Sequence, residues 1–170
     1  MRPFGYFKPS NLIEALSLLE KKGVGAKVIA GGTEIVIYLK SRQMSPKSLI
    51  DISDLDLDFI KADDKFLRVG PLTTHNSLEK SSLIKEKAGI LGEAAKQIGT
   101  AQVRNIGTLG GNLCNASPAA DTATPLLVLG ASLKLMNLSG ERFVPIENFF
   151  LDVKKTLLQS DELLTEIKIP

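Results

Sequence analysis

Two pairs of adjacent glycines are the residues of this chain whose type and spacing could do chemistry. Gly31-Gly32 follows an apolar run, and Gly110-Gly111 follows Thr108 and Leu109. Glycine has no Cβ atom to keep a ligand from the main chain, and its positive φ values let successive N–H groups point into one concavity. Either pair alone could be a plain turn between core elements. The two pairs together predict a phosphate-binding site.

The first glycine segment, residues 28–35, has the pattern of a strand, a glycine turn and a helix. A helix start offers free N–H groups and the positive end of the helix dipole to an anion such as a pyrophosphate. Glu34 falls in the first turn of the helix expected from Glu34 to about Lys40. Neither glycine pair fits G-x-G-x-x-G or ends in Lys-Ser/Thr, which disfavours a Rossmann fold and a P-loop NTPase.

The second glycine segment, residues 106–112, begins a stretch that reads as a ligand loop and extends to Asp121. The Thr108 hydroxyl and the Asn112 amide would add neutral donors for a phosphate. Asp121 offers an acceptor for a hydroxyl or a ring N–H. One loop could therefore hold both ends of a nucleotide.

Composition argues against several classes of partner. The chain has 170 residues, 44% of them hydrophobic, and its 21 basic and 19 acidic residues leave a net charge of +2. The basic residues are scattered, so we expect neither nucleic acid nor an anionic membrane as a partner. No N-terminal apolar region or membrane-length apolar run occurs, which predicts a cytoplasmic protein.

The residues suited to metal or acid–base chemistry are few. A single cysteine, Cys114, cannot form an intramolecular disulfide or hold an iron–sulfur cluster alone, so any cluster must lie on a partner. A single histidine, His75, leaves little material for a zinc site or a catalytic triad. The acidic run 51–58 is interleaved with leucines, which favours a solvated connector over a metal site. We predict no metal ligands and no catalytic residues.

Hydrophobic periodicity predicts an α+β fold with two lobes. Residues 1–57 would form a small β-α-β lobe, with a helix from Asn11 to Gly23 and strands at Ala26–Ala30 and Ser48–Ile52. Residues 58–170 would form a mainly antiparallel sheet with helices. The elements expected there are a hairpin at 59–70, a core helix at 82–98, a short helix at 121–130, a hairpin at 132–144 and an edge strand at 163–169.

With both glycine segments placed, the chain resembles the FAD-binding medium subunit of the molybdenum hydroxylases, the xanthine dehydrogenase and aerobic carbon monoxide dehydrogenase family. The resemblance covers almost the whole chain. The stretches that carry it are Phe7-Lys8-Pro9, Ala30–Glu34, Val69–His75, Arg104–Asn112, Ala116–Asp121 and Leu163–Pro170.

The resemblance implies a two-lobed FAD-binding fold of the vanillyl-alcohol oxidase (PCMH) type, with noncovalent FAD between the lobes and its pyrophosphate on both glycine segments. The implied contacts on the adenine–pyrophosphate side are Val28, Ile29, Ala30, Gly31, Gly32, Thr33, Glu34 and Ile35. The second half of the phosphate site would be Thr108, Leu109, Gly110, Gly111 and Asn112. Asp121 would bond the ribityl or adenosine region, and Ile98 and Leu164 would lie near the flavin ring.

By the same resemblance, the chain would be an electron-transfer flavoprotein of an oxidoreductase complex. An iron–sulfur small subunit with 2Fe–2S clusters and a large subunit with the molybdenum cofactor would be its partners, and NAD or another acceptor would take the electrons. Family members continue past the closing Ile-Pro into a C-terminal domain, so we expect that domain to be absent here and the flavin to be more exposed. The alternatives are a non-catalytic nucleotide-binding or assembly module and a free-standing flavin oxidase, which the lack of acid–base residues disfavours.

Overall fold

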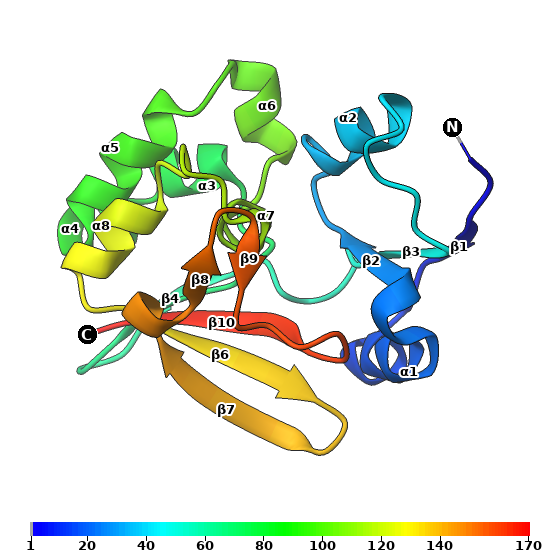
Figure 1. Ribbon diagram of the computed structural model, residues 1–170. Coiled ribbons are helices and arrows are strands. Elements are labelled where there is room, and N and C mark those ends of the chain that lie inside the picture. The colour runs from blue at the N-terminus through cyan, green and yellow to red at the C-terminus, as the bar shows by residue number, and fades with distance from the viewer. Residues whose placement is uncertain (1) are drawn as a thin grey trace.

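The computed structural model describes residues 2–170 and contains a small parallel sheet, a larger antiparallel sheet and a two-stranded hairpin (Figure 1). The small sheet has the strand order β1-β3-β2 and carries helices α1 and α2. Its strands and helices are β1 (Gly5–Phe7), β2 (Ala26–Ile29), β3 (Ser48–Asp51), α1 (Leu12–Lys22) and α2 (Ile35–Lys40). The predicted β-α-β unit is confirmed, because β2 and β3 pair in parallel across α2.

Local sequence signals determine both ends of α1. The Asn11 side chain accepts the Glu14 N–H at 2.9 Å, and the chain leaves the helix at Gly23, whose φ is 55°. Between these caps, Ala15, Leu16 and Leu19 recur at helical spacing and are all buried against the sheet.

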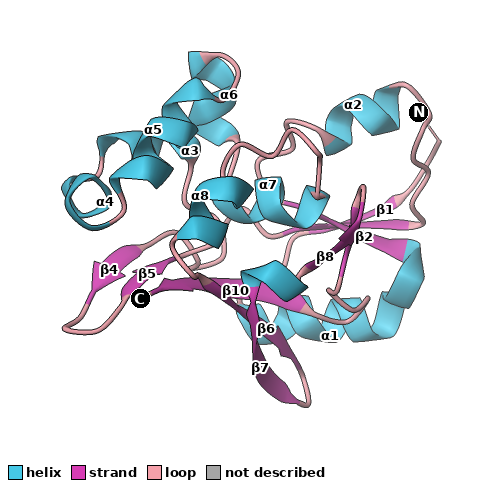
Figure 2. Cartoon of the chain, turned by 60° about the vertical axis from the view of Figure 1, so that its left-hand side comes forward, coloured by secondary structure: helices cyan, strands magenta, loops and turns pink. Residues whose placement is uncertain are grey.

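The larger sheet has the strand order β4-β5-β10-β6-β7, and its hydrogen-bonded neighbours are antiparallel. Six helices lie on one of its faces (Figure 2). Its strands are β4 (Ile60–Ala62), β5 (Leu67–Val69), β6 (Ser132–Asn137), β7 (Gly140–Pro145) and β10 (Leu163–Ile169). The helices are α3 (His75–Lys80), α4 (Ser82–Lys87), α5 (Gly89–Gln97), α6 (Ala101–Ile106), α7 (Leu109–Asn115) and α8 (Ala123–Val128).

Two hydrophobic cores stabilise the two lobes. The larger lies between the antiparallel sheet and its helices and includes Leu91, Leu133 and Phe149. The smaller lies under α1 and takes in Leu72 and Leu163 from the second half of the chain. Strand β10 therefore contributes to both cores and ties the lobes together.

The structure corrects two predicted elements of the second lobe. Strand β10 is central rather than at an edge, because it pairs with β5 on one side and β6 on the other. The helix expected over 82–98 is divided into α4 and α5 at Ala88, whose φ of −145° and ψ of 46° are not helical. This break turns the chain so that Ile84 and Leu91, on different helices, both enter the larger core.

Four short elements escaped prediction. These are β1, helix α6, and the hairpin of β8 (Phe150–Asp152) and β9 (Lys155–Thr156). Each has too few residues to show a hydrophobic period, and β1 forms by pairing with β3, which is distant in sequence. In Figure 1 the β8–β9 hairpin rises from the sheet toward α7.

Candidate functional site

A cleft of about 570 Å³ lies where the two lobes meet. Both glycine segments line it, together with the start of α2, residues of α6 and α7, and the β8–β9 turn. A volume of this size falls within the range of small-molecule and cofactor sites. Lining residues outside the sequence prediction are Lys27, Tyr38, Met44, Ile52, Pro71, Leu72, His75, Val103, Cys114, Asn115, Lys154, Leu158 and Leu163.

The structure brings nearly all the predicted site residues together. Residues 28–35, Ile98 and Leu164 line the cleft, and so do Thr108, Gly110, Gly111 and Asn112. Two predicted residues do not line it. Leu109 is fully buried in the larger core, and Asp121 is exposed outside the cleft.

The first glycine segment leaves a row of backbone donors without acceptors. Among the hydrogen bonds of residues 2–170, none has the amide of residue 31, 32, 33, 34 or 35 as its donor. The N-cap residue of α2 is Glu34, and its side chain does not cap the helix. Because these residues line the cleft, their N–H groups are available to an anionic ligand.

The two glycines of this segment are needed for different structural reasons. Gly32 has a φ of 74°, where an L side chain is strained. Gly31 packs against the second glycine segment so closely that a Cβ atom would lie 1.7 Å from the carbonyl oxygen of Ile106. The main chains of the two segments therefore touch each other, and Gly31 is required for that contact.

The second glycine segment is not a loop but the start of α7, and the nest of free amides expected there does not form. The amides of residues 109–111 all have acceptors within the protein: the Thr73 carbonyl at 2.9 Å, the Pro71 carbonyl at 2.8 Å and the Thr108 hydroxyl at 3.1 Å. The segment that precedes α3 accepts the amides of residues 109 and 110, and the amide of Gly111 is taken by the cap of α7. A Cβ atom on Gly110 would lie 2.5 Å from the Cβ of Pro71, so this glycine too serves packing.

Side chains of the second glycine segment still offer donors to the cleft. The Asn112 Oδ1 atom accepts the Thr122 hydroxyl at 2.6 Å, which turns the Asn112 NH₂ group to other partners. The Thr108 oxygen caps α7 as an acceptor, and its O–H remains a donor.

The Glu34 carboxylate links the two lobes across the cleft. It accepts the Tyr38 hydroxyl at 2.8 Å within the first lobe. From the second lobe it accepts the Asn115 side-chain amide and the Lys154 ammonium, the latter at 2.7 Å. Neither Asn115 nor Lys154 was a predicted site residue, and no local signal marks them, because their partner Glu34 is distant in the chain.

His75 and Cys114, which both line the cleft, are uncharged near neutral pH. Burial lowers the pKa of His75 to about 4, against the opposing effect of Asp121, and its Nδ1 atom is buried without a partner. Burial raises the pKa of the Cys114 thiol to about 12. Near pH 7 the imidazole is therefore neutral and the thiol protonated, so the thiol is a poor nucleophile.

Two further features are absent from residues 2–170. These residues contain no group of three or more His, Cys, Asp and Glu side chains placed to hold a metal ion. Nor is any helix among them long and apolar enough to cross a membrane.

Known proteins resemble the chain closely in both sequence and structure. A family model described as the FAD binding domain in molybdopterin dehydrogenase matches residues 2–170. The nicotinate dehydrogenase FAD-subunit of Eubacterium barkeri is 35% identical over 99% of this chain and 59% of its own length. The xanthine dehydrogenase FAD-binding subunit of Escherichia coli O157:H7 is 36% identical over 97% of this chain and 57% of its own.

The solved structure of a carbon monoxide dehydrogenase from Hydrogenophaga pseudoflava that lacks the Mo-pyranopterin moiety superposes with a TM-score of 0.96 at 35% identity. The match covers 100% of this chain and 60% of that one, so the chain spans about 60% of the length of its relatives. These matches confirm the two-lobed α+β fold. The chain belongs to the family of FAD-binding domains of molybdopterin dehydrogenases.

Proposed function

We propose that the chain binds FAD noncovalently in the cleft and transfers electrons through it within a molybdenum hydroxylase-type complex. The observation that carries this proposal is the row of five unpartnered amides, residues 31–35, on the wall of a cofactor-sized cleft. A diphosphate needs several fixed donors, and these amides supply them without a charged side chain. The relatives named as FAD subunits support the same ligand.

The remaining walls suit the other parts of FAD. Thr108 and Asn112 add side-chain donors from the second glycine segment, while Ile98, Val103 and Leu164 form apolar walls for a flavin ring. We place the boundary between the lobes at residues 57 and 58, so that each lobe supplies one side of the cleft. When bound, FAD supplies the redox chemistry, and the protein binds, orients and shields it.

The complex we propose has two further subunits. An iron–sulfur small subunit would deliver electrons from 2Fe–2S clusters, and a large subunit would carry the molybdenum cofactor. NAD or another acceptor would then oxidise the flavin, in the cytoplasm. The single cysteine of the chain supports this division, because an iron–sulfur cluster needs several thiolates.

A visible absorption spectrum of the purified chain, followed by heat release and identification of the nucleotide, tests the proposal. We expect FAD to be released and to rebind on reconstitution. A chain that stays colourless after incubation with FAD contradicts the proposal. If such a chain still bound the partner subunits, it would instead be an assembly module.

Hydrogen exchange measured residue by residue tests which amides bind the diphosphate. Added FAD should slow exchange of the amides of residues 31–35, which have no acceptor in the free protein. The amides of residues 109–111 should change little, because they already donate within the protein. Protection of the second group alone would move the phosphate site to α7.

A further inference from the structure

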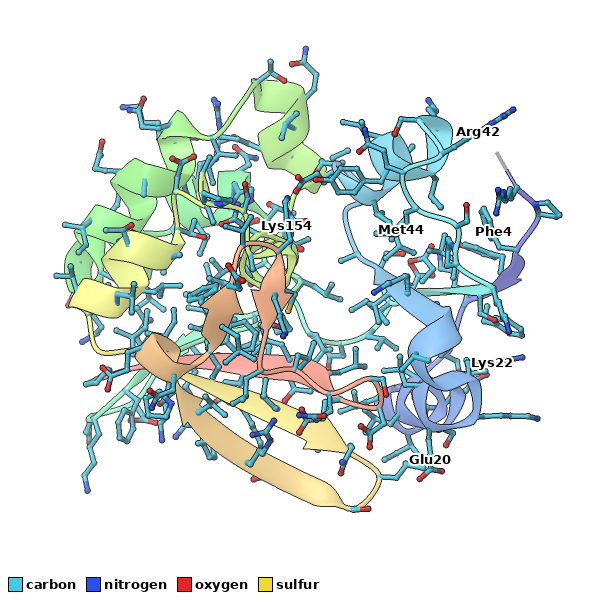
Figure 3. All side chains as sticks on the ribbon, in the orientation of Figure 1. Phe4, Glu20, Lys22, Arg42, Met44 and Lys154 are labelled. Atoms are coloured by element: carbon cyan, nitrogen blue, oxygen red, sulfur yellow. The ribbon has the colours of Figure 1, made fainter. Side chains whose placement is uncertain are left out.

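Lys154 reaches the proposed FAD site from a part of the chain far from both glycine segments. It lies at the tip of the β8–β9 hairpin (Figure 3), and its ammonium is 2.7 Å from the Glu34 carboxylate. Its backbone N–H donates to the Ala116 carbonyl at 2.9 Å. Lys154 and Ala116 have φ values of 59° and 47°, so this contact joins two non-glycine residues in the left-handed region. The surrounding fold therefore holds the turn in a specific position.

The position of Glu34 creates an electrostatic problem for an anionic ligand. Its carboxylate belongs to the same segment as the free amides and lines the same cleft. A diphosphate bound by those amides would be repelled by an unneutralised carboxylate nearby. Tyr38 and Asn115 donate hydrogen bonds to Glu34 but bring no charge. Among residues 2–170, Lys154 alone forms an ion pair with Glu34.

We infer that Lys154 controls FAD affinity by neutralising Glu34, so that the diphosphate can occupy the amides of residues 31–35. This inference rests on the proposed function. The pair is 36% and 42% exposed at its side chains, and ion pairs this exposed add little to folding stability. Loss of Lys154 should therefore act on ligand binding much more than on folding.

Titration of the flavin-free chain with FAD, followed by flavin fluorescence, tests the inference in four variants. We expect Lys154→Met to weaken FAD binding about tenfold, which corresponds to one uncompensated like charge in a partly screened site. Glu34→Gln alone should bind FAD at least as tightly as the wild type. The double variant Glu34→Gln/Lys154→Met should return to within about twofold of the wild type, because no carboxylate then needs neutralising. Lys155→Met is the matched control, since Lys155 is exposed and outside the cleft.

Each other outcome identifies a different error. Wild-type affinity in Lys154→Met, with FAD bound normally by the wild type, overturns this inference and leaves the proposed function intact. A double variant as weak as Lys154→Met overturns it too, because Lys154 would then bind the ligand directly. A Tm that falls in Lys154→Met but not in Lys155→Met would assign Lys154 to folding. A wild-type chain that binds no FAD overturns both this inference and the proposed function.

Discussion

The two glycine segments look alike in sequence but use their backbone amides in opposite ways. In the first, the amides of residues 31–35 have no acceptor among residues 2–170, and these residues line the cleft. In the second, the amides of residues 109–111 bond to Pro71, Thr73 and Thr108, and the segment begins a helix. A glycine pair therefore marks close approach of the main chain, and only its surroundings decide whether a ligand or another segment approaches.

The two segments also depend on each other. Gly31 packs on the carbonyl of Ile106, at the start of the second segment, while Gly110 packs on Pro71. The second segment therefore acts as a platform that positions the first, whose amides remain free.

Gly31→Ala should have the largest effect, because the new Cβ would lie 1.7 Å from a backbone oxygen that cannot move alone. We expect the free energy of unfolding to fall by about 3 kcal/mol, as for severe overpacking. FAD affinity should fall by about tenfold or more as the free amides shift. Denaturant unfolding and FAD titration measure the two effects.

The matched control for that variant is Gly89→Ala. No heavy atom lies within 4 Å of a Cβ built on Gly89. Its unfolding free energy should stay within about 0.5 kcal/mol of the wild type, with FAD binding unchanged. Equal behaviour of the two variants would show that the segments do not touch.

Low pH should lower the free energy of unfolding through His75, the only histidine of the sequence. Its ring packs against Gly107 in the second glycine segment. Burial lowers its pKa from 6.5 to about 4, so the unfolded chain takes up the proton first as pH falls. The contribution of His75 to the free energy of unfolding is therefore fully present above pH 6.5 and is lost as the pH falls toward 4. We expect a loss of about 2 kcal/mol at about pH 5.

Denaturant unfolding at several pH values, compared between the wild type and His75→Gln, isolates this loss. Carboxylates titrate in both proteins, so only the difference between the two curves reports His75. The NMR titration of the His75 ring gives its pKa directly. A ring pKa near 6.5 in the folded protein would contradict the expected burial effect.

Thr108→Ala should have a smaller effect on stability, because it removes one hydroxyl, which caps α7 and lines the cleft. The Thr108 oxygen accepts the Gly111 N–H at 3.1 Å, and loss of such a cap lowers stability by about 1 kcal/mol. Thr108→Ser keeps the hydroxyl and should restore both stability and FAD binding. Thermal unfolding of the two variants measures how much the Thr108 cap contributes to stability. A Thr108→Ala variant as stable as the wild type would show that α7 does not need this cap.

Elements whose signals are local were predictable. The caps of α1, the β-α-β unit and the hairpin of β6 and β7 each follow from residues close in sequence. The cleft wall formed by residues 28–35 was also predictable, because the strand, the glycine turn and the helix are consecutive.

Features that depend on distant partners were not predictable. The free or bonded state of an amide depends on whether a segment such as Pro71–Thr73 lies beside it. Likewise, Lys154 meets Glu34 only through the fold, and β10 is central only because β5 and β6 both pair with it. The single-chain pattern of β10 fits an edge strand and a central strand equally well.

Gly111→Ala should have the smallest effect. A Cβ on Gly111 would meet only the Thr108 Oγ1 atom, at 2.9 Å, so the hydroxyl must shift and weaken the cap. Alanine also favours a helix over glycine by about 1 kcal/mol, which offsets that loss. We therefore expect stability within about 0.5 kcal/mol of the wild type and FAD affinity within about twofold, since this Cβ points at the cap and not at free amides. A large loss of FAD affinity with unchanged stability would place a phosphate on the second glycine segment after all, and the two segments would then share the ligand.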